Sequence, residues 1–342
     1  MDDQLRVVLA GCGGISQAWL APVVKRTDVA IVGLVDLALE NARQRAVEYN
    51  LKNVETGTNL ALILDRTAPD IVFDCTVPEA HIDVTLEALS HGCHVLGEKP
   101  LADTMQNARR MVSAAQAAGK VYAVMQNRRY MAEIRALRAY LETGDIGAIT
   151  TCNCDFYLAP HFGGFRDQMQ HVLLLDMAIH TFDAARLLTG ADPQAVYCKE
   201  WNPAGSWYAH GASAVAVFEM SNGIVYTYRG SWCAEGLPTT WESDWRIIGE
   251  RGTACWDGAQ NMRAEAAGSV AGFLANHRPG EIAPWSDPSK TGGHAGLIAD
   301  FIECIRSGRT PETTGSDNIK SLAMVFGAIE SAETGLPVEI QL

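Results

Sequence analysis

The sequence has few basic residues for its length. Its 342 residues include 27 Lys and Arg against 40 Asp and Glu, so the formal net charge is −13. Nucleic acids and anionic membranes repel such a surface, and we expect neither as a partner. There is also no apolar run long enough to span a bilayer and no signal-peptide pattern at the N-terminus. We therefore expect a cytoplasmic protein.

The cysteines and histidines lack the spacing of metal or redox motifs. Nine cysteines, an odd number, are scattered without a CxxC pair. Cys152 and Cys154 lie two apart in a strand-like segment and should point the same way, where neighbours seldom form a disulfide. Reduced thiols are the simplest interpretation. No Cys/His grouping has the spacing of a four-ligand set, so we expect no metal site.

What the sequence does contain is a regular alternation of apolar strands and helices in its first third. Since the length exceeds what one hydrophobic core usually serves, we expect two domains, residues 1–125 and 126–342. Strands separated by helices require a parallel sheet covered on both faces, so the fold class of the first domain is α/β, doubly wound. Strands are expected at 7–9, 70–75, 94–97 and 121–125, with another ending at Asp36, and helices at 41–49, 59–66, 79–90 and 103–118.

After residue 125 the pattern changes to longer strand-like stretches separated by turn residues. We expect strands at 148–158, 195–201, 212–220, 224–232, 244–249 and 338–340, and helices at 130–143, 173–188, 295–306 and 317–334. The second domain is therefore predicted to be α+β, with a large, open, mostly antiparallel sheet and helices on one face. Its other face would need a partner chain, so we expect a homodimer or homotetramer.

The segment 5–36 has the order of a strand, a glycine turn, a helix and a second strand that ends on an acid. Gly11 permits the sharp turn, Gly13 leaves room for a pyrophosphate, and the helix that opens near Gly14 and Ile15 directs its free N–H groups at that phosphate. Asp36 stands where a carboxylate accepts hydrogen bonds from an adenosine ribose. These residues predict an NAD site, and because a carboxylate repels a 2′-phosphate, NADP is less favoured. The usual third glycine is Ser16 here, so the helix should pack less closely.

Two short segments follow predicted strands of the same domain, where a parallel sheet binds its ligands. One begins at Thr76 and includes Pro78 and His81, and the other is Glu98-Lys99-Pro100. Proline holds the preceding Lys99 in an extended conformation at the strand end. A solvated lysine in a turn is the alternative, but the position favours a functional role.

In the second domain, Asp176, His180 and Asp183 have helical spacing and would share one stripe of a helix. A carboxylate one turn from an imidazole raises the pKa of the histidine and can fix its tautomer, as a general base requires. A core histidine satisfied by a nearby acid is the alternative. Hydride transfer from an alcohol needs such a base and a cationic donor for the oxygen, and His180 and Lys99 supply these two roles.

The chain resembles the glucose-fructose oxidoreductase / inositol dehydrogenase / MocA family of NAD(P)-dependent oxidoreductases. The resemblance rests on GCGGIS at 11–16, TVPEAH at 76–81, EKP at 98–100, NRRY at 127–130, the Asp176 and His180 pair, and the C-terminal helices. It implies that Lys99 polarises a substrate hydroxyl, that His180 is the general base and that Asp176 orients the substrate or the base. Substrate contacts are implied for Arg129 and Asp183 as well, and we expect further cofactor contacts from Thr76, Pro78, His81, Glu98 and Arg128.

The resemblance implies a dehydrogenase acting on a sugar or a cyclic polyol such as an inositol. Two alternatives stay open: transient oxidation that permits sugar elimination or glycoside cleavage, and a sensor that binds NAD and a sugar without chemistry. The family usually has two glycines before the aspartate, whereas this chain has Gln170-His171-Val172. His171 is either a further substrate ligand or a structural histidine. Seven of the eight tryptophans lie between Trp201 and Trp285; they could stack on a sugar ring, but most should pack in the sheet or at subunit contacts.

Overall fold

The computed structural model describes residues 4–270, 273 and 275–342. The chain forms two compact units. The first runs to Asn127 and takes in Ser289–Ile319, and the second comprises Arg128–Pro288 and Lys320–Leu342. Residues 289–319, which the sequence analysis placed in the second domain, therefore group with the first unit, where α8 (His294–Ser307) packs against α1 (Ser16–Val23).

The first unit contains a six-stranded parallel sheet in the order β3-β2-β1-β4-β5-β6. In register, Ala10 lies beside Asp74 and Asp74 beside Gly97, so β1, β4 and β5 end at the same edge. The chain order reverses between β1 and β4, which is where a doubly wound sheet opens its ligand crevice. The strands are β1 (Leu5–Ala10), β2 (Val29–Val35), β3 (Glu55–Gly57), β4 (Ile71–Asp74), β5 (His94–Gly97) and β6 (Tyr122–Val124).

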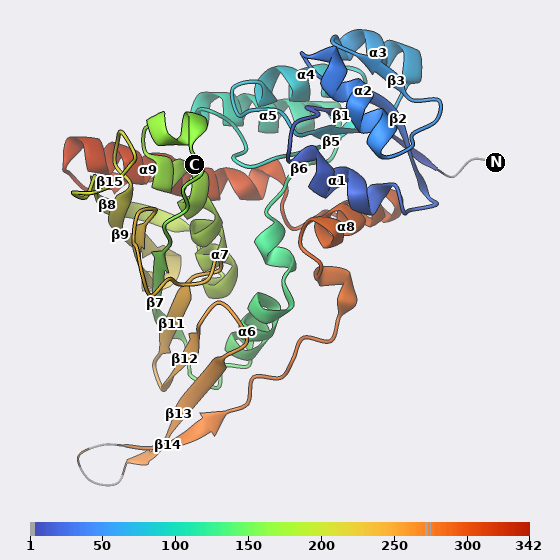
Figure 1. Cartoon of the computed structure of the whole chain (residues 1–342). Coiled ribbons are helices and arrows are strands. Elements are labelled where there is room, and N and C mark those ends of the chain that lie inside the picture. Colours follow the sequence, from blue (N-terminus) through green and yellow to red (C-terminus); the bar gives the residue numbers. More distant parts are fainter. Residues whose placement is uncertain (1–3, 271–272, 274) are drawn as a thin grey trace. The chain divides into compact units, whose positions relative to one another are not determined.

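Helices connect these strands, as Figure 1 shows. They are α2 (Leu39–Glu48), α3 (Leu60–Thr67), α4 (His81–Ser90) and α5 (Met105–Ala118), together with α1. Two of them begin at side-chain caps: Asn59 accepts a hydrogen bond from Leu62 N, and Thr104 accepts one from Asn107 N. The apolar strands lie fully buried beneath the helices, with β1 and β4 contributing Val7, Val8, Leu9, Val72 and Phe73 at 0% exposure.

The second unit is built on a nine-stranded sheet in the order β14-β13-β12-β11-β7-β10-β9-β8-β15. Of the paired strands, β7 and β10 run parallel and the other neighbours run antiparallel. The strands are β7 (Ile149–Tyr157), β8 (Pro193–Trp201), β9 (Ser213–Met220), β10 (Val225–Ser231), β11 (Asp244–Gly249), β12 (Gly252–Trp256), β13 (Met262–Val270), β14 (Ala275–Gly280) and β15 (Val338–Glu339).

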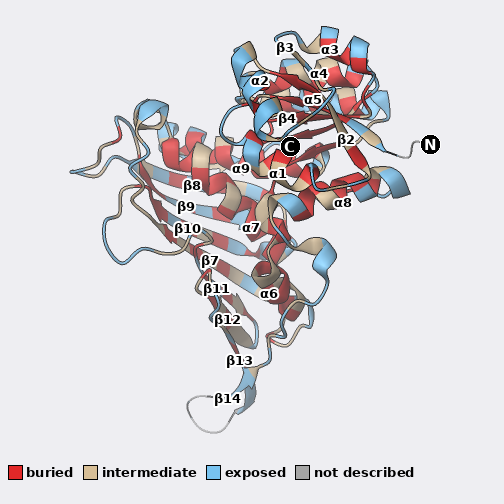
Figure 2. Cartoon of the chain, turned by 45° about the vertical axis from the view of Figure 1, so that its right-hand side comes forward, coloured by how far each residue is buried: buried red, intermediate tan, exposed pale blue. Residues whose placement is uncertain are grey.

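This sheet has one buried and one exposed face. Buried and exposed residues alternate along β9, β10 and β11, as Figure 2 shows. Cys152 and Cys154 both face the buried side, as predicted. Against that side lie α6 (Ala132–Glu142) and α7 (Ile179–Thr189), which also pack against each other. The helix α9 (Gly315–Thr334) supplies residues to the second unit from Lys320 onward.

The predicted fold class is confirmed, but four strands were missed. The three residues of β3 are too short for a periodic signal. Strands β12 to β14 are rich in residues of low strand propensity, such as Ala, Gly and Glu in β13. Pro279 is tolerated because β14 is the edge strand of the described sheet.

Two further observations concern the whole described chain. None of the helices between residue 4 and the C-terminus is both long and apolar enough to cross a membrane. All nine cysteines lie in the described ranges, and each is a free thiol.

Candidate active site

The glycine turn of the first unit forms an open cradle of backbone amides. Gly11 has φ +87°, and a Cβ there would lie 2.5 Å from the carbonyl carbon and oxygen of Cys75, so only glycine fits. Gly13 and Gly14 are exposed, with no atom within 4 Å of where a Cβ would stand. Within the described residues, no backbone oxygen accepts from the N–H groups of Gly13, Gly14 or Ile15. Free amides at a helix start are suited to a pyrophosphate, and the binding of that group by these residues stays a prediction.

Ser16 replaces the third glycine without opening a gap. Its side chain is fully buried, and its hydroxyl donates to the carbonyl oxygen of Gly13 at 2.6 Å. Arg45 on α2 donates from Nε to Ser16 Oγ at 3.0 Å and from Nη2 to Gly13 O at 3.1 Å. Ser16 and Arg45 together fix the backbone of the glycine turn through the carbonyl oxygen of Gly13.

Asp36 follows β2 and organises the same turn. Its Oδ2 accepts the N–H of Cys12 at 2.8 Å, while Oδ1 accepts from Ala38 N at 2.9 Å and from Asn41 Nδ2 at 3.1 Å. The carboxylate is thus fixed beside the glycine turn and is partly exposed. A carboxylate has about four acceptor positions, so Asp36 keeps acceptor capacity for ribose hydroxyls.

The loop after β4 is held by a buried pair. His81, 1% exposed, places Nδ1 at 2.8 Å from Oδ2 of Asp74, and Oδ1 of Asp74 accepts from Thr76 N at 3.0 Å. Burial alone lowers the pKa of His81, but the charge of Asp74 and its hydrogen bond outweigh this and raise that pKa above its usual value. The contact between His81 and Asp74 thus stabilises the loop after β4. In the same loop, Thr76 and Pro78 are partly exposed.

The loop after β5 presents Lys99 at the same edge of the sheet. Glu98 is 7% exposed; its Oε1 accepts from Trp19 Nε1 at 2.7 Å, and its Oε2 accepts the backbone N–H of Lys99 at 3.1 Å. His294 on α8 places Nε2 at 3.8 Å from Glu98 Oε1. These contacts fix the backbone from which the partly exposed Lys99 side chain extends.

In the second unit, Asp176 and His180 lie on two successive helical segments. Asp176 belongs to a π-helix, Leu173–Ala178, and His180 to the first turn of α7. The predicted helical segment 173–188 is therefore confirmed, and its first six residues take the wider π turn, a feature frequent at functional sites. Oδ2 of Asp176 accepts from Arg166 Nε at 2.8 Å. Both Asp176 and His180 are partly exposed.

Arg128 is a partly exposed cation next to this segment. Its Nη2 donates to Sδ of Met177 at 3.4 Å, and no carboxylate among the described residues forms an ion pair with it. Burial lowers the pKa of Arg128 to about 10, although Glu242 acts in the opposite direction. Such a guanidinium is suited to an oxygen-rich group of a ligand.

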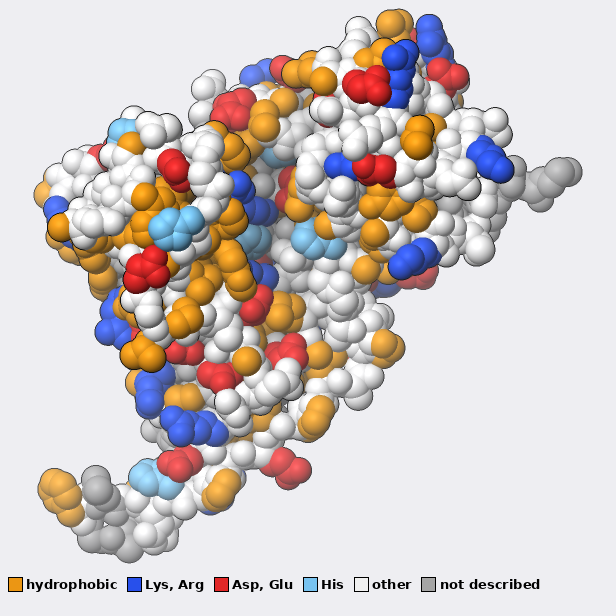
Figure 3. Space-filling model, viewed as in Figure 1, with side chains coloured by type: hydrophobic (Ala, Val, Ile, Leu, Met, Phe, Trp, Pro, Cys, Tyr) orange, Lys and Arg blue, Asp and Glu red, His pale blue; other side chains and the backbone are white. Residues whose placement is uncertain are grey.

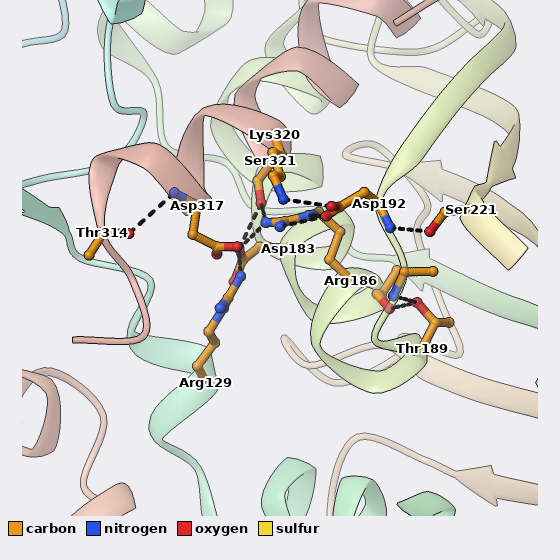
Figure 4. A network of polar contacts seen from close by, with 12 residues as sticks. Arg129, Asp183, Arg186, Thr189, Asp192, Ser221, Thr314, Asp317, Lys320 and Ser321 are labelled. Carbon is orange, nitrogen blue, oxygen red and sulfur yellow. Dashed lines mark hydrogen bonds and ion pairs between the residues drawn. The ribbon is translucent and has the colours of Figure 1, made fainter. Parts of the chain in front are cut away.

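Arg129 and Asp183 form a buried ion pair. Arg129 donates from Nε and Nη2 to the two carboxylate oxygens of Asp183 at 2.7 and 2.6 Å, and Ser321 Oγ donates to Oδ1 at 2.7 Å. Exposure is 6% for Arg129 and 2% for Asp183. Figure 4 shows this cluster, which continues through Arg186, Asp192 and Lys320. The structure gives both residues a role in packing, while their predicted substrate contacts stay a prediction.

His171 is held by two glutamates. Its Nδ1 lies 2.6 Å from Glu200 Oε2 and its Nε2 lies 3.3 Å from Glu333 Oε1. The hydrogen bond with Glu200 is the main reason that the pKa of His171 is raised, and partial burial opposes it. Of the two interpretations left open above, this geometry favours a structural histidine.

The comparisons with known proteins agree with the motifs. A family model described as an oxidoreductase family with an NAD-binding Rossmann fold matches residues 5–126, and a model of the Gfo/Idh/MocA C-terminal domain matches residues 134–255. The chain belongs to the Gfo/Idh/MocA family of oxidoreductases.

Similar proteins include both named and unnamed members of this family. An uncharacterized protein of Sinorhizobium fredii is 30% identical over 98% of this chain and 96% of its own length. An inositol 2-dehydrogenase of Ralstonia nicotianae is 26% identical over 99% of this chain and 97% of its own. The crystal structure of an oxidoreductase from Agrobacterium radiobacter in complex with NAD+, L-tartaric acid and magnesium has a TM-score of 0.85 at 22% identity, covering 98% of each chain, and supports the fold. The chain is an NAD-binding oxidoreductase.

Sequence reasoning missed four residues that position this Gfo/Idh/MocA site. They are Arg45 beneath the glycine turn, Trp19 and His294 beside Glu98, and Arg166 at Asp176. Each supports a predicted residue that lies ten or more positions away in the chain, and none belongs to a motif. A local pattern carries no signal for such partners.

Proposed function

We propose that the chain is an NAD-dependent dehydrogenase of a sugar or cyclic polyol, in which Lys99 polarises the reacting oxygen and His180 is the general acid and base. The observation that carries the proposal is the shared edge of β1, β4 and β5. Ala10 lies beside Asp74 and Asp74 beside Gly97, so the three strands end together. Lys99, two residues after Gly97, and the glycine turn after Ala10 therefore leave the sheet at the same edge. The relative named as an inositol 2-dehydrogenase supports the substrate class.

NAD supplies a hydride acceptor when it is bound, and the chain supplies the remaining parts. The free amides at Gly13, Gly14 and Ile15 would hold the pyrophosphate, and Asp36 the adenosine ribose, which disfavours a 2′-phosphate. We retain Thr76, Pro78, His81, Glu98 and Arg128 as the further cofactor-binding residues.

Each of the proposed catalytic side chains performs one task. The ammonium group of Lys99 donates to the substrate oxygen and favours its deprotonated form. His180 takes the hydroxyl proton during oxidation and returns it during reduction. Asp176, held by Arg166, orients the substrate or the base. Arg129 and Asp183 are proposed to contact the substrate.

The decisive experiment is a screen of sugars, inositols and their keto forms with NAD and NADP side by side, followed by the absorbance of the reduced nicotinamide. We expect NADH to accumulate with at least one cyclic polyol or sugar. Turnover of a sugar without net NADH would instead indicate transient oxidation. Binding of NAD and sugar without any turnover would contradict the dehydrogenase and favour a sensor.

A double-mutant cycle tests whether Lys99 and His180 act on the same carbon. We expect Lys99→Met and His180→Ala each to lower kcat by about 100-fold or more, and the double variant to lose far less than the product of both factors, since groups that act as one unit are not additive. Lys120→Met and His171→Gln serve as matched controls from the same two units. Full additivity would contradict a shared reaction centre.

We also propose that the exposed face of the second unit's sheet contacts a second copy of the chain. A shallow groove of about 1130 Å³ on this face is lined by Val215, Val217, Asp155 and Arg229, among others. Light scattering should show a dimer or tetramer, and Val217→Arg should reduce the mass while Val47→Arg, 80% exposed in the first unit, should not. A monomeric wild type would contradict this assembly.

We propose in addition that the protein is located in the cytoplasm.

A further inference from the structure

Three loops leave the same edge of the second unit's sheet. Strands β7 and β10 are parallel, and their last residues, Tyr157 and Ser231, lie opposite each other. Ser213, the first residue of the antiparallel β9, pairs with Ser231 and with Trp201, the last residue of β8. The segments 158–172, 202–212 and 232–243 therefore start or end together, and the first of them leads into the π-helix with Asp176.

These loops expose large aromatic side chains. Phe162 is 49% exposed, Phe165 70% and Trp241 45%. In Figure 3, hydrophobic side chains gather over the part of the second unit where β7 to β9 lie. Exposed apolar groups that gather in this way mark an interaction or ligand site, because leaving them in water is unfavourable.

The exposed rings rest on a buried support. Trp232, 1% exposed, contacts Phe162 edge-on at 5.8 Å between ring centroids and Trp241 at 5.7 Å. Phe162 and Trp241 lie 6.4 Å apart, and Phe156 packs edge-on against Trp232 from within the sheet. The two outer rings are therefore held in place before any ligand arrives, which lowers the entropy cost of binding.

Arg166 connects the aromatic rings to Asp176. Its guanidinium carbon lies 4.9 Å from the ring centroid of Phe162 and 4.8 Å from that of Phe165, and its Nε donates to Asp176 Oδ2 at 2.8 Å. Between the two phenylalanines, Gly163 and Gly164 have φ +68° and +69°, a backbone that other residues rarely adopt. The two phenylalanine rings are therefore connected through Arg166 to Asp176, the carboxylate that the proposed mechanism places at the substrate.

The charge of Arg166 is already matched. The guanidinium of Arg166 and the carboxylate of Asp176 form an ion pair and balance each other's charge, with the side chains 32% and 16% exposed. A phosphate or carboxylate on the ligand would compete with Asp176 for the guanidinium. A neutral ring would not, since the C–H face of a pyranose or the face of an aryl group packs on aromatic rings without needing a counter-charge.

We propose that Phe162, Phe165 and Trp241 form a subsite for a second, uncharged ring that is joined to the ring on which the enzyme acts. The substrate would then be a glycoside whose second ring, which stays attached during the oxidation, is a pyranosyl or an aryl group. This inference rests on the proposed function, which assigns the reacting ring. It adds that the reacting ring is part of a larger, two-ring substrate.

The test compares glucose with cellobiose and phenyl β-glucoside as probes, measuring kcat/KM with NAD for the 342-residue chain. We expect the wild type to prefer both two-ring probes by about ten-fold, and Phe165→Ala and Trp241→Ala to remove most of that preference while changing kcat/KM for glucose less than about two-fold. Leu237→Ala is the matched control, because this side chain is 98% exposed and precedes Trp241 in the same loop. A preference confined to cellobiose identifies a pyranosyl group, and one confined to phenyl β-glucoside an aryl group.

A wild type without preference, or a preference that both variants retain, would overturn the subsite. If no probe is oxidised, the proposed function fails for these sugars, and saturation-transfer NMR then decides on the subsite alone. Binding of cellobiose or phenyl β-glucoside that Phe165→Ala loses and Leu237→Ala keeps would uphold it, whereas equal binding by both variants, or none by the wild type, would reject it. Circular dichroism confirms that each variant is folded; Phe165, at 70% exposure, contributes little to the core.

Discussion

Replacing Asp183 by asparagine separates the packing role of this carboxylate from its predicted contact with substrate. In the folded protein its oxygens accept two hydrogen bonds from Arg129 and one from Ser321, and Arg186 Nη1 lies 3.8 Å from Oδ1. The substitution keeps the shape of the side chain but removes the charge and one of the acceptors. Arg186 keeps its ion pair with Asp192 at 3.0 Å, so the main loss falls on Arg129.

The size of this loss follows from burial and distance. Two opposite charges about 4 Å apart at an effective dielectric constant of about 20 attract each other by about 4 kcal/mol. Breaking a buried ion pair by removing one partner costs about 3–5 kcal/mol in measured cases. We therefore expect Asp183→Asn to lower the free energy of unfolding by about 3–5 kcal/mol, out of a total of about 5–15 kcal/mol for a typical protein.

The assay is urea unfolding followed by tryptophan fluorescence. All tryptophans except Trp19 lie in the second unit, so the signal reports on the unit that contains Asp183. Ser321→Ala should cost about 1 kcal/mol, the net value of one hydrogen bond. Glu142→Gln removes an ion pair with Arg138 whose side chains are 62% and 35% exposed, and should cost at most about 1 kcal/mol. An Asp183→Asn protein as stable as these controls, with a strongly raised KM, would refute the packing role.

Three further predictions follow from the site. Asp36→Ala should shift the ratio of kcat/KM for NAD and NADP towards NADP by about ten-fold, and an unchanged ratio would contradict the ribose contact. His180→Ala should lower kcat by about 100-fold or more with little change in NAD affinity, and equal losses in both would indicate packing. The pKa of His171 is raised in the folded protein, so the protonated imidazole stabilises the fold. This stabilisation is complete below the ordinary pKa of histidine and is lost as the pH rises through the folded-state pKa. The stability difference between wild type and His171→Gln should therefore be about 2 kcal/mol at acidic pH and shrink towards alkaline pH, and a difference independent of pH would refute the paired imidazolium.

The sequence was sufficient for features that depend on near neighbours in the chain. Strand and helix periodicity, the glycine turn and the acid at Asp36 are local patterns, so the parallel sheet and the cofactor turn could be predicted. The position of Lys99 at the edge of the sheet followed from the same reasoning, because parallel strands that alternate with helices end on one side. The weakly periodic strands β3 and β12 to β14 escaped for the same physical reason, since short or Ala- and Gly-rich segments carry little local preference.

The tertiary structure decided what each predicted residue touches. Arg45 reaches Ser16 across 29 positions, Arg129 reaches Asp183 across 54, and Trp19 reaches Glu98 across 79. Such contacts arise from the packing of whole helices and strands, so composition and spacing do not encode them individually. They gave Asp183 and His171 partners within the protein, while the substrate contact of Asp183 stays a prediction, and they brought Trp241 to 6.4 Å from Phe162 between ring centroids. The sequence alone thus determined the type of fold and the cofactor turn, whereas long-range packing determined which of the remaining polar groups are held by the protein and which aromatic rings face solvent.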